Sequence, residues 1–113
     1  MTELTVEIDD DGDRSVVGLA GELDIDSVDE VRAAVQDRFA AGGLRALVVN
    51  LAELTFIDSS GLGLLIELRR LALSEDVAFE LVDVPSGPAR VIAIAGLTET
   101  FGLPAPEGPT PGS

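Results

Sequence analysis

The sequence predicts an α/β domain in which a mixed sheet of about four strands is flanked by about three helices. Some runs alternate apolar and polar residues or are continuously apolar, as strands are, and others repeat apolar residues at helical spacing. A turn signal separates the first two strand-like runs, whereas helical segments separate the later ones, which favours parallel pairing there. The strand-like runs are residues 4–8, 14–20, 44–51 and 77–84, and the helix-like segments are 28–41, about 59–73 and 89–95.

The first half of the chain predicts a hairpin followed by a capped helix. Asp11-Gly12 is a hairpin turn signal, so the first two strands are expected to pair antiparallel. Ser27 and Glu30 have the spacing of a capping box at a helix start. Gly42-Gly43 is expected to end that helix. The predicted buried face of the helix consists of Val28, Val31, Val35 and Phe39.

The second half predicts two further strand and helix pairs. Residues 44–51 are almost continuously apolar, as in a strand that is buried on both faces. A helix is expected to begin near Ser59 or Ser60 and to run to about Leu73. After the strand at 77–84, Ser86 is the expected N-cap of a short helix that Gly96 closes, and 97–103 is left unassigned. We expect one domain over residues 1–103 and a disordered Pro- and Gly-rich tail at 104–113.

Composition excludes several classes of function. The 113 residues carry a net charge of −14, which disfavours binding to nucleic acid and to anionic membranes. This charge fits a basic patch on a protein partner, although acidity can equally serve solubility alone. The chain has no Cys and no His, so thiol chemistry and the commonest general base are absent, and no metal or other cofactor is expected. The N-terminus does not resemble a signal peptide and no run would span a bilayer, so a cytoplasmic protein is expected.

The segment that is most informative about function runs from Asp58 through Ser59, Ser60, Gly61 and Leu62 to Gly63, where a buried strand leads into a helix. Ligands and partners bind at such carboxyl ends of strands, and a helix N-terminus offers free N–H groups to a phosphate. The two glycines would let a partner backbone approach closely. The ordinary alternative is that these residues only cap the helix and allow tight packing.

The helix that follows this segment has apolar residues on two faces. One face is the expected core face and consists of Gly61, Leu64, Leu65, Leu68, Leu71 and Ala72. The other carries Leu62, Ile66 and Leu73, where a surface helix is normally polar. That strip is either a partner surface or is covered by another element of the fold, and the sequence favours neither reading.

The chain resembles the STAS domain family, in its anti-sigma-factor antagonist branch. The resemblance covers residues 4–103 and depends most on the segment that runs from Phe56 to Gly63. Weaker matches are Gly21-Glu22-Leu23-Asp24, Val48-Val49-Asn50-Leu51 and Ala95-Gly96-Leu97.

The resemblance implies a non-enzymatic switch. The unmodified antagonist would bind an anti-sigma factor, itself an ATP-dependent serine kinase, and so free a sigma factor. The kinase would phosphorylate Ser60 and end binding, and a protein phosphatase would reset the switch. Asp24, Asp58 and Ser59 would then belong to the partner-binding surface, together with Gly61, Leu62, Gly63 and Ile66.

Three other readings compete with this one. A serine hydrolase lacks support, because a nucleophilic Ser60 would need a base and the chain has no His or Lys. The alternating acids at 9–13 and 22–26 could suggest a calcium or magnesium site, but the first set lacks the EF-hand Gly and distal Glu. Finally, the chain could be a constitutive STAS subunit of a larger assembly, such as a membrane-transport or signalling complex, without phosphorylation control.

Overall fold

The structure is a computed structural model that describes residues 3–104 and contains one sheet with the strand order β1-β2-β3-β4. β1 pairs antiparallel with β2, and the β2–β3 and β3–β4 pairs are parallel, so the predicted mixed sheet is confirmed. The strands are β1 Thr5–Asp11, β2 Arg14–Leu23, β3 Ala46–Ile57 and β4 Ala78–Val82. The helices are α1 Val28–Ala41, α2 Ser59–Ser74 and α3 Ser86–Ile94. Except for Pro104, the predicted disordered tail lies outside the described residues.

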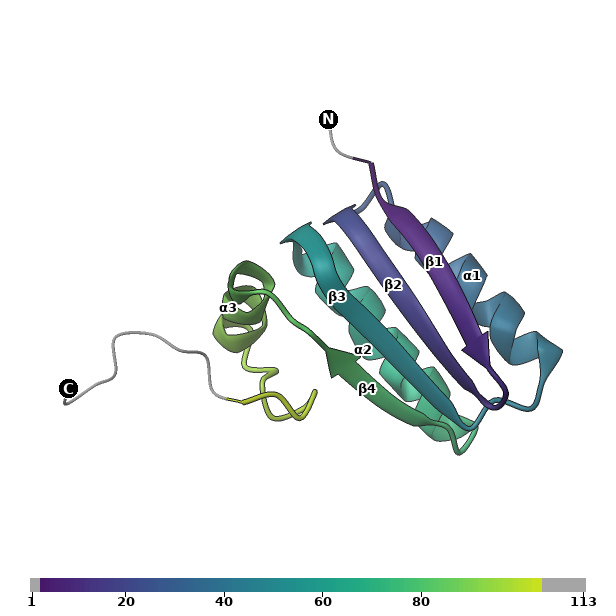
Figure 1. Cartoon of the computed structure of the whole chain (residues 1–113). Helices are drawn as coiled ribbons and strands as arrows, with labels where there is room; N and C mark the ends of the chain where they lie inside the picture. The colour runs from purple at the N-terminus through teal and green to yellow at the C-terminus, as the bar shows by residue number, and fades with distance from the viewer. Residues whose placement is uncertain (1–2, 105–113) are drawn as a thin grey trace.

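The helices α1 and α2 cover one face of the sheet, and within residues 3–104 no helix covers the opposite face of β1, β2 and β3 (Figure 1). α3 packs against β3 near the end of the sheet where β3 leads into α2 (Figure 1). The core lies between the sheet and α1 and α2, where aliphatic side chains from every layer are fully buried. Its largest buried members include Leu19, Leu23, Leu47, Leu64, Leu65 and Leu68.

The hairpin and α1 follow local signals in the sequence. Gly12 has a positive φ of 68° at the β1–β2 turn, and Asp11 pairs with Arg14 across it. On α1 the three valines of the predicted face are buried, and Phe39 packs partly against the core. The helix ends at Ala41, with Gly42 at a φ of 79°, which confirms the glycine stop.

The capping box at the start of α1 was a wrong prediction. Ser27 precedes the helix as expected, but its side chain caps no helix N–H group. Its buried hydroxyl instead donates to the Glu22 carbonyl oxygen at 2.9 Å and accepts from the Asp24 N–H at 3.0 Å. The polar groups left open where β2 ends compete for this hydroxyl more successfully than the helix does.

β3 is longer than predicted, and α3 begins earlier. β3 runs beyond residue 51 because the β2–β3 pairing shifts register between Gly18 and Ala20, and the buried positions then change to Leu54 and Ile57. α3 begins at Ser86 with Pro85 as N-cap residue, so Ser86 is not the cap. Pro88 lies in the first turn, where no helix hydrogen bond needs its missing N–H.

The unassigned stretch 97–103 forms turns that return to the core. The buried Phe101 ring lies 6.3 Å from the Phe79 ring of β4, measured between centroids. This contact holds the chain after α3 against the last strand.

Candidate functional site

The carboxyl ends of β2 and β3 lie side by side and carry the two acidic residues singled out in the sequence. Leu23 pairs with Ile57 in parallel register, and Asp24 and Asp58 directly follow them. The Asp58 N–H donates to the Leu23 carbonyl oxygen at 3.3 Å, which ties the two loops together. The structure therefore places both acidic residues at the same edge of the sheet as the start of α2.

Asp58 is the residue that caps α2. It has extended backbone angles, and its carboxylate accepts the Gly61 N–H at 3.0 Å while its carbonyl accepts the Leu62 N–H at 3.0 Å. Ser59 and Ser60 are consequently the first two helical residues, so neither serine is needed as a cap. Ser60 is half-buried, and within residues 3–104 its hydroxyl makes no hydrogen bond.

The Asp24 loop is held in place from two sides. The Asp24 carboxylate accepts the Asp26 N–H at 3.0 Å, and the Ser27 hydroxyl bonds the backbone on both sides of the turn. The Thr55 hydroxyl of β3 donates to the Gly21 carbonyl oxygen at 3.0 Å. These contacts fix the loop against β3 before any partner is bound.

Three glycines of the motifs at residues 21–24 and 56–63 have different structural roles. Gly21 has a φ of 109°, and a Cβ there would lie 2.2 Å from the Glu3 carbonyl oxygen, so only glycine fits. A Cβ on Gly61 would lie 2.7 Å from both Ile57 Cγ1 and the Leu23 carbonyl oxygen, because α2 begins in close contact with β2 and β3. A Cβ on Gly63 would meet nothing within 4 Å, so packing does not explain this glycine.

The predicted apolar strip on α2 is mostly covered. Leu62 is only 8% exposed and belongs to the core, so it does not form part of an exposed strip, and Ile66 is half-buried against the same core. Only Leu73 is prominently exposed, at 51%, and it lies at the far end of α2. The alternative that other elements of the fold cover the strip is therefore correct for Leu62.

Two exposed apolar side chains near the site were missed in the sequence. Ile25 is 68% exposed directly after Asp24, and Phe56 is 46% exposed two residues before Asp58. Both flank the paired carboxyl ends of β2 and β3, where Phe56 lies opposite Glu22. The one available signal was Ile25 itself, an isolated apolar residue between two aspartates.

The start of α2 offers N–H donors, and its first turns carry no basic side chain. The first turn contains no acidic residue, and its Ser59 and Ser60 N–H groups make no hydrogen bond among residues 3–104. The first arginine along α2 is Arg69, roughly 13 Å from Ser60 at helical rise. A phosphate on Ser60 would meet backbone N–H groups and the Asp58 carboxylate, but no neighbouring arginine on this helix.

Within residues 3–104, no group of three potential ligands is placed to hold a metal ion. The same residues form no helix with the length and apolar character that a membrane span requires.

The fold and this site define a small α/β domain with a half-buried serine in the first turn of a helix, at the same sheet edge as two aspartates that follow parallel strands. A family profile described as "Mlab, STAS domain" matches residues 6–104, and the chain belongs to the STAS domain family.

Similar proteins are named as anti-sigma factor antagonists. The chain is 34% identical over 84 residues to an anti-sigma F factor antagonist of Lysinibacillus sphaericus, covering 73% of this chain and 70% of that one. A crystal structure of an anti-sigma factor antagonist from Mycobacterium paratuberculosis is similar with a TM-score of 0.78 and 29% identity, over 89% of this chain and 85% of that one. The anti-sigma factor antagonist SpoIIAA in its unphosphorylated form has a TM-score of 0.75 and 25% identity, over 84% of both chains. SpoIIAA from Bacillus has also been solved in a phosphorylated form, which has a TM-score of 0.69 and 25% identity, over 84% of this chain and 86% of that one.

Proposed function

We propose that this protein is a cytoplasmic anti-sigma factor antagonist that acts by binding and is controlled by phosphorylation of Ser60. In its unmodified form it binds an anti-sigma factor that is also a serine kinase, and a sigma factor is released. Phosphorylation by that kinase ends the complex, and a protein phosphatase restores it. The names of the relatives support the role, and a relative solved in both phosphorylation states supports the control.

The observation that carries the proposal is the state of Ser60. Its hydroxyl is bound to no other described residue, it lies in the first turn of α2, and Asp58 already performs the capping that a serine would otherwise provide. A side chain without a structural partner, at a junction between Asp24 and Asp58, is available to a partner's active site.

The phosphoryl transfer needs only a nucleophile from this chain. The Ser60 oxygen attacks the γ-phosphorus of an ATP held by the kinase, an O–P bond forms, and the bond to the ADP oxygen breaks. The hydroxyl proton passes to a base on the kinase, because this chain has no His or Lys to accept it. The antagonist is then a substrate and a ligand rather than an enzyme.

The phosphate would act through charge at a packed interface. It adds about −1.5 to −2 charge beside Asp58, and no arginine in the first turns of α2 neutralises it. Burying this charge against a partner costs desolvation free energy. A coupling free energy of about 2–3 kcal/mol between phosphorylation and partner binding corresponds to roughly 100-fold weaker binding. The hydrogen bond between the Asp58 N–H and the Leu23 carbonyl need not rearrange for the phosphate to weaken binding.

The partner surface proposed here consists of the loop ends around Ser60 and the exposed side of the first turns of α2. Asp24, Asp58 and Ser59 supply its polar part, and the exposed Ile25 and Phe56 supply apolar area that a partner would bury. Gly61 and the buried Leu62 act indirectly, because they hold α2 against β2 and β3. Gly63 leaves open space through which a partner backbone could approach, and Ile66 contributes only its exposed edge.

The proposal is tested by incubating the full chain with ATP and an extract of its source cells, followed by peptide mass spectrometry. We expect one phosphate on Ser60, no phosphate in Ser60→Ala, and normal modification in the matched control Ser59→Ala. The protein that modifies it is then purified, and its affinity is measured for the wild type and for Ser60→Asp.

We expect Ser60→Asp to bind at least about tenfold more weakly and Ser60→Ala to bind like the wild type. Equal modification of Ser60→Ala and wild type would refute Ser60 as the acceptor. A kinase that is active on another substrate but leaves this chain unmodified would refute the phosphorylation control and favour a constitutive subunit.

A further inference from the structure

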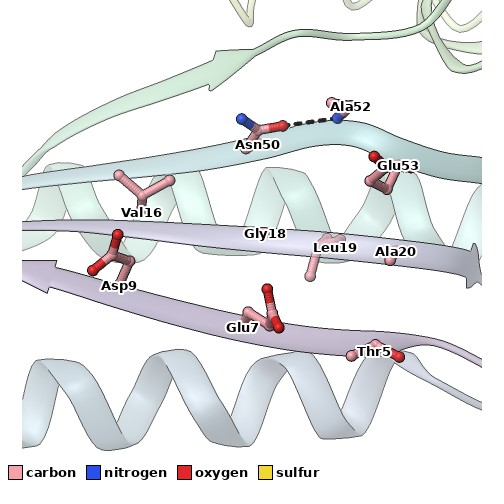
Figure 2. Close-up of a pocket in the computed structure, with 10 residues that line it drawn as sticks. All are labelled: Thr5, Glu7, Asp9, Val16, Gly18, Leu19, Ala20, Asn50, Ala52 and Glu53. Carbon is pink, nitrogen blue, oxygen red and sulfur yellow. Dashed lines mark hydrogen bonds between the residues drawn. The ribbon is translucent and has the colours of Figure 1, made fainter.

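The face of the sheet opposite α1 and α2 carries a second surface that the proposed function does not use. Alternate residues of each strand point to this face, and a groove of about 480 Å³ runs over it along β2, between β1 and β3 (Figure 2). Among the described residues its lining comes only from these strands, and α1 and α2 lie on the other face of the sheet (Figure 1). The groove is therefore separate from Ser60, which lies on α2.

The groove exists because its floor is made of small side chains. Gly18 and Ala20 of β2 and Ala52 of β3 line it where larger residues would fill it. A Cβ on Gly18 would meet only the Glu7 carbonyl oxygen, at 3.9 Å, so the backbone does not require glycine at this position. The fold would tolerate a larger residue here, so the groove results from the small side chains at these positions and not from a requirement of the backbone.

The walls of the groove carry carboxylates on both sides. Glu7 and Asp9 of β1 stand on one side and Glu53 of β3 on the other (Figure 2). None of these three takes part in an ion pair or a side-chain hydrogen bond among residues 3–104. One step further, Glu80 of β4 lies in register with Val48 and extends the negative charge across this face.

The negative charge of this face determines which ligands can bind in the groove. A second copy would bring the same carboxylates and a net charge of −14, and residues 105–113 contain Glu107 and no basic residue. Both would be repelled, whereas a cationic ligand would find unpaired carboxylates on either side.

We propose that the groove binds an extended, arginine- or lysine-bearing segment of a partner protein, in addition to the partner that binds near Ser60. Glu7 and Asp9 are alternate residues of one strand, so their side chains repeat at about 7 Å. Alternate side chains of an extended peptide repeat at the same distance, so cationic residues at every second position face Glu7 and Asp9 in turn. Residues between them point toward Glu53, and the small floor leaves room for the peptide backbone.

The experiment uses the full chain and a fluorescein-labelled peptide of about nine residues in which arginine alternates with alanine. Affinity is measured by fluorescence anisotropy, and the binding site is mapped by NMR shifts of backbone amides. The neutralised variant is Glu7→Gln with Asp9→Asn. Its matched control is Glu30→Gln with Asp37→Asn, which makes the same charge change on the exposed side of α1.

We expect the affinity to fall about tenfold for the Glu7 and Asp9 variant and less than about twofold for the α1 control. Gly18→Val leaves the charge unchanged but fills the floor, so it should also lose about tenfold while keeping the wild-type circular dichroism spectrum. Ser60→Glu should bind the peptide like the wild type, because Ser60 lies outside the groove. Peptide binding to the groove can therefore be confirmed even if the proposed control by phosphorylation is refuted. The shifts should lie on β1, β2 and β3.

Equal losses in the two charge variants would overturn the proposal, because they would show attraction to net negative charge alone. Shifts confined to α1 or α2, or undiminished binding to Gly18→Val, would also overturn it. If dilution of the protein or removal of residues 105–113 strengthens peptide binding, the groove is occupied by a second copy or by the chain's own tail, and the partner proposed here is wrong.

Discussion

Gly61→Ala and Gly63→Ala are expected to change the stability of the domain in opposite directions, although both replace a glycine near the start of α2. At Gly63 the added methyl group meets nothing within 4 Å, and the backbone is already helical. At Gly61 it would lie 2.7 Å from Ile57 Cγ1 and 2.7 Å from the Leu23 carbonyl oxygen. The pair therefore tests whether α2 begins in the close contact that the structure shows.

The magnitudes follow from two opposing effects. Replacing a helical glycine by alanine stabilises by up to about 1 kcal/mol where space is free. Forcing a methyl group into a packed contact costs about 1–3 kcal/mol. Gly63→Ala should thus gain about 1 kcal/mol, and Gly61→Ala should lose up to about 2 kcal/mol. For a domain of this size, 1 kcal/mol corresponds to roughly 4 °C in Tm.

Urea unfolding followed by far-ultraviolet circular dichroism measures both changes, since the sequence has no Trp or Tyr to report by fluorescence. If Gly61→Ala is stabilised as much as Gly63→Ala, the close approach of α2 to the Leu23 carbonyl is wrong. If Gly63→Ala is stabilised but binds the proposed kinase more weakly, Gly63 contributes to the proposed partner surface. Unchanged kinase binding would remove Gly63 from that surface.

Three further predictions concern capping, burial and charge. Asp58→Ala should destabilise the domain by about 1 kcal/mol in urea unfolding, and Asp58→Asn by less, because asparagine still caps; equal losses would contradict the role of the Gly61 N–H bond. Leu62→Ala should cost about 2–4 kcal/mol and Leu73→Ala less than about 1 kcal/mol, and a thermal melt that ranks them the other way would contradict the burial of Leu62. The pKa of Asp10 lies below its usual value because its carboxylate accepts hydrogen bonds from Ser15 and Arg38. This interaction stabilises the fold above the unfolded-state pKa of Asp10 and is lost as the pH falls through the folded-state pKa. Arg38→Met should raise the pKa of Asp10 in an NMR titration, and an unchanged titration would exclude Arg38 as a cause.

Local signals were sufficient for most of the fold. Asp11-Gly12 is a turn that works through its own backbone preferences, and the valines of α1 repeat at the helical period, so both predictions needed no knowledge of distant residues. The order of elements then restricted the sheet to parallel pairing after the hairpin, which the registers of β2, β3 and β4 confirm.

The missed features depend on contacts that are distant in sequence or on a shift in period. Ser27 turns back because the Glu22 carbonyl is open where β2 ends, which the capping-box spacing does not report. The end of β3 was not recognised because a register shift changes which residues are buried. Leu62 has the periodicity of an exposed strip, and its burial is decided by the neighbours that the fold brings over it.

The candidate site was predicted in outline but not in detail. The family resemblance singled out Ser60 and Asp24, and the strand-to-helix junction singled out Asp58, yet three consecutive capping residues gave no means of choosing among them, and the structure assigns the cap to Asp58. The exposure of Ile25 and Phe56 was missed. Whether an apolar residue near a strand end is exposed depends on the conformation of the following loop, which the composition does not reveal.

The Leu23 carbonyl accepts the Asp58 N–H and faces the bare Cα of Gly61, so one backbone oxygen joins the end of β2, the cap and the first turn of α2. A partner that docks around Ser60 meets loops whose backbone freedom was already lost during folding. Little ordering entropy then opposes association, and affinity can be set by the few side chains at the junction. Because the backbone is held in this way, a phosphate on Ser60 would change the charge of the surface without changing its shape. The rate of switching would then be set by the modifying enzymes and not by refolding of the domain.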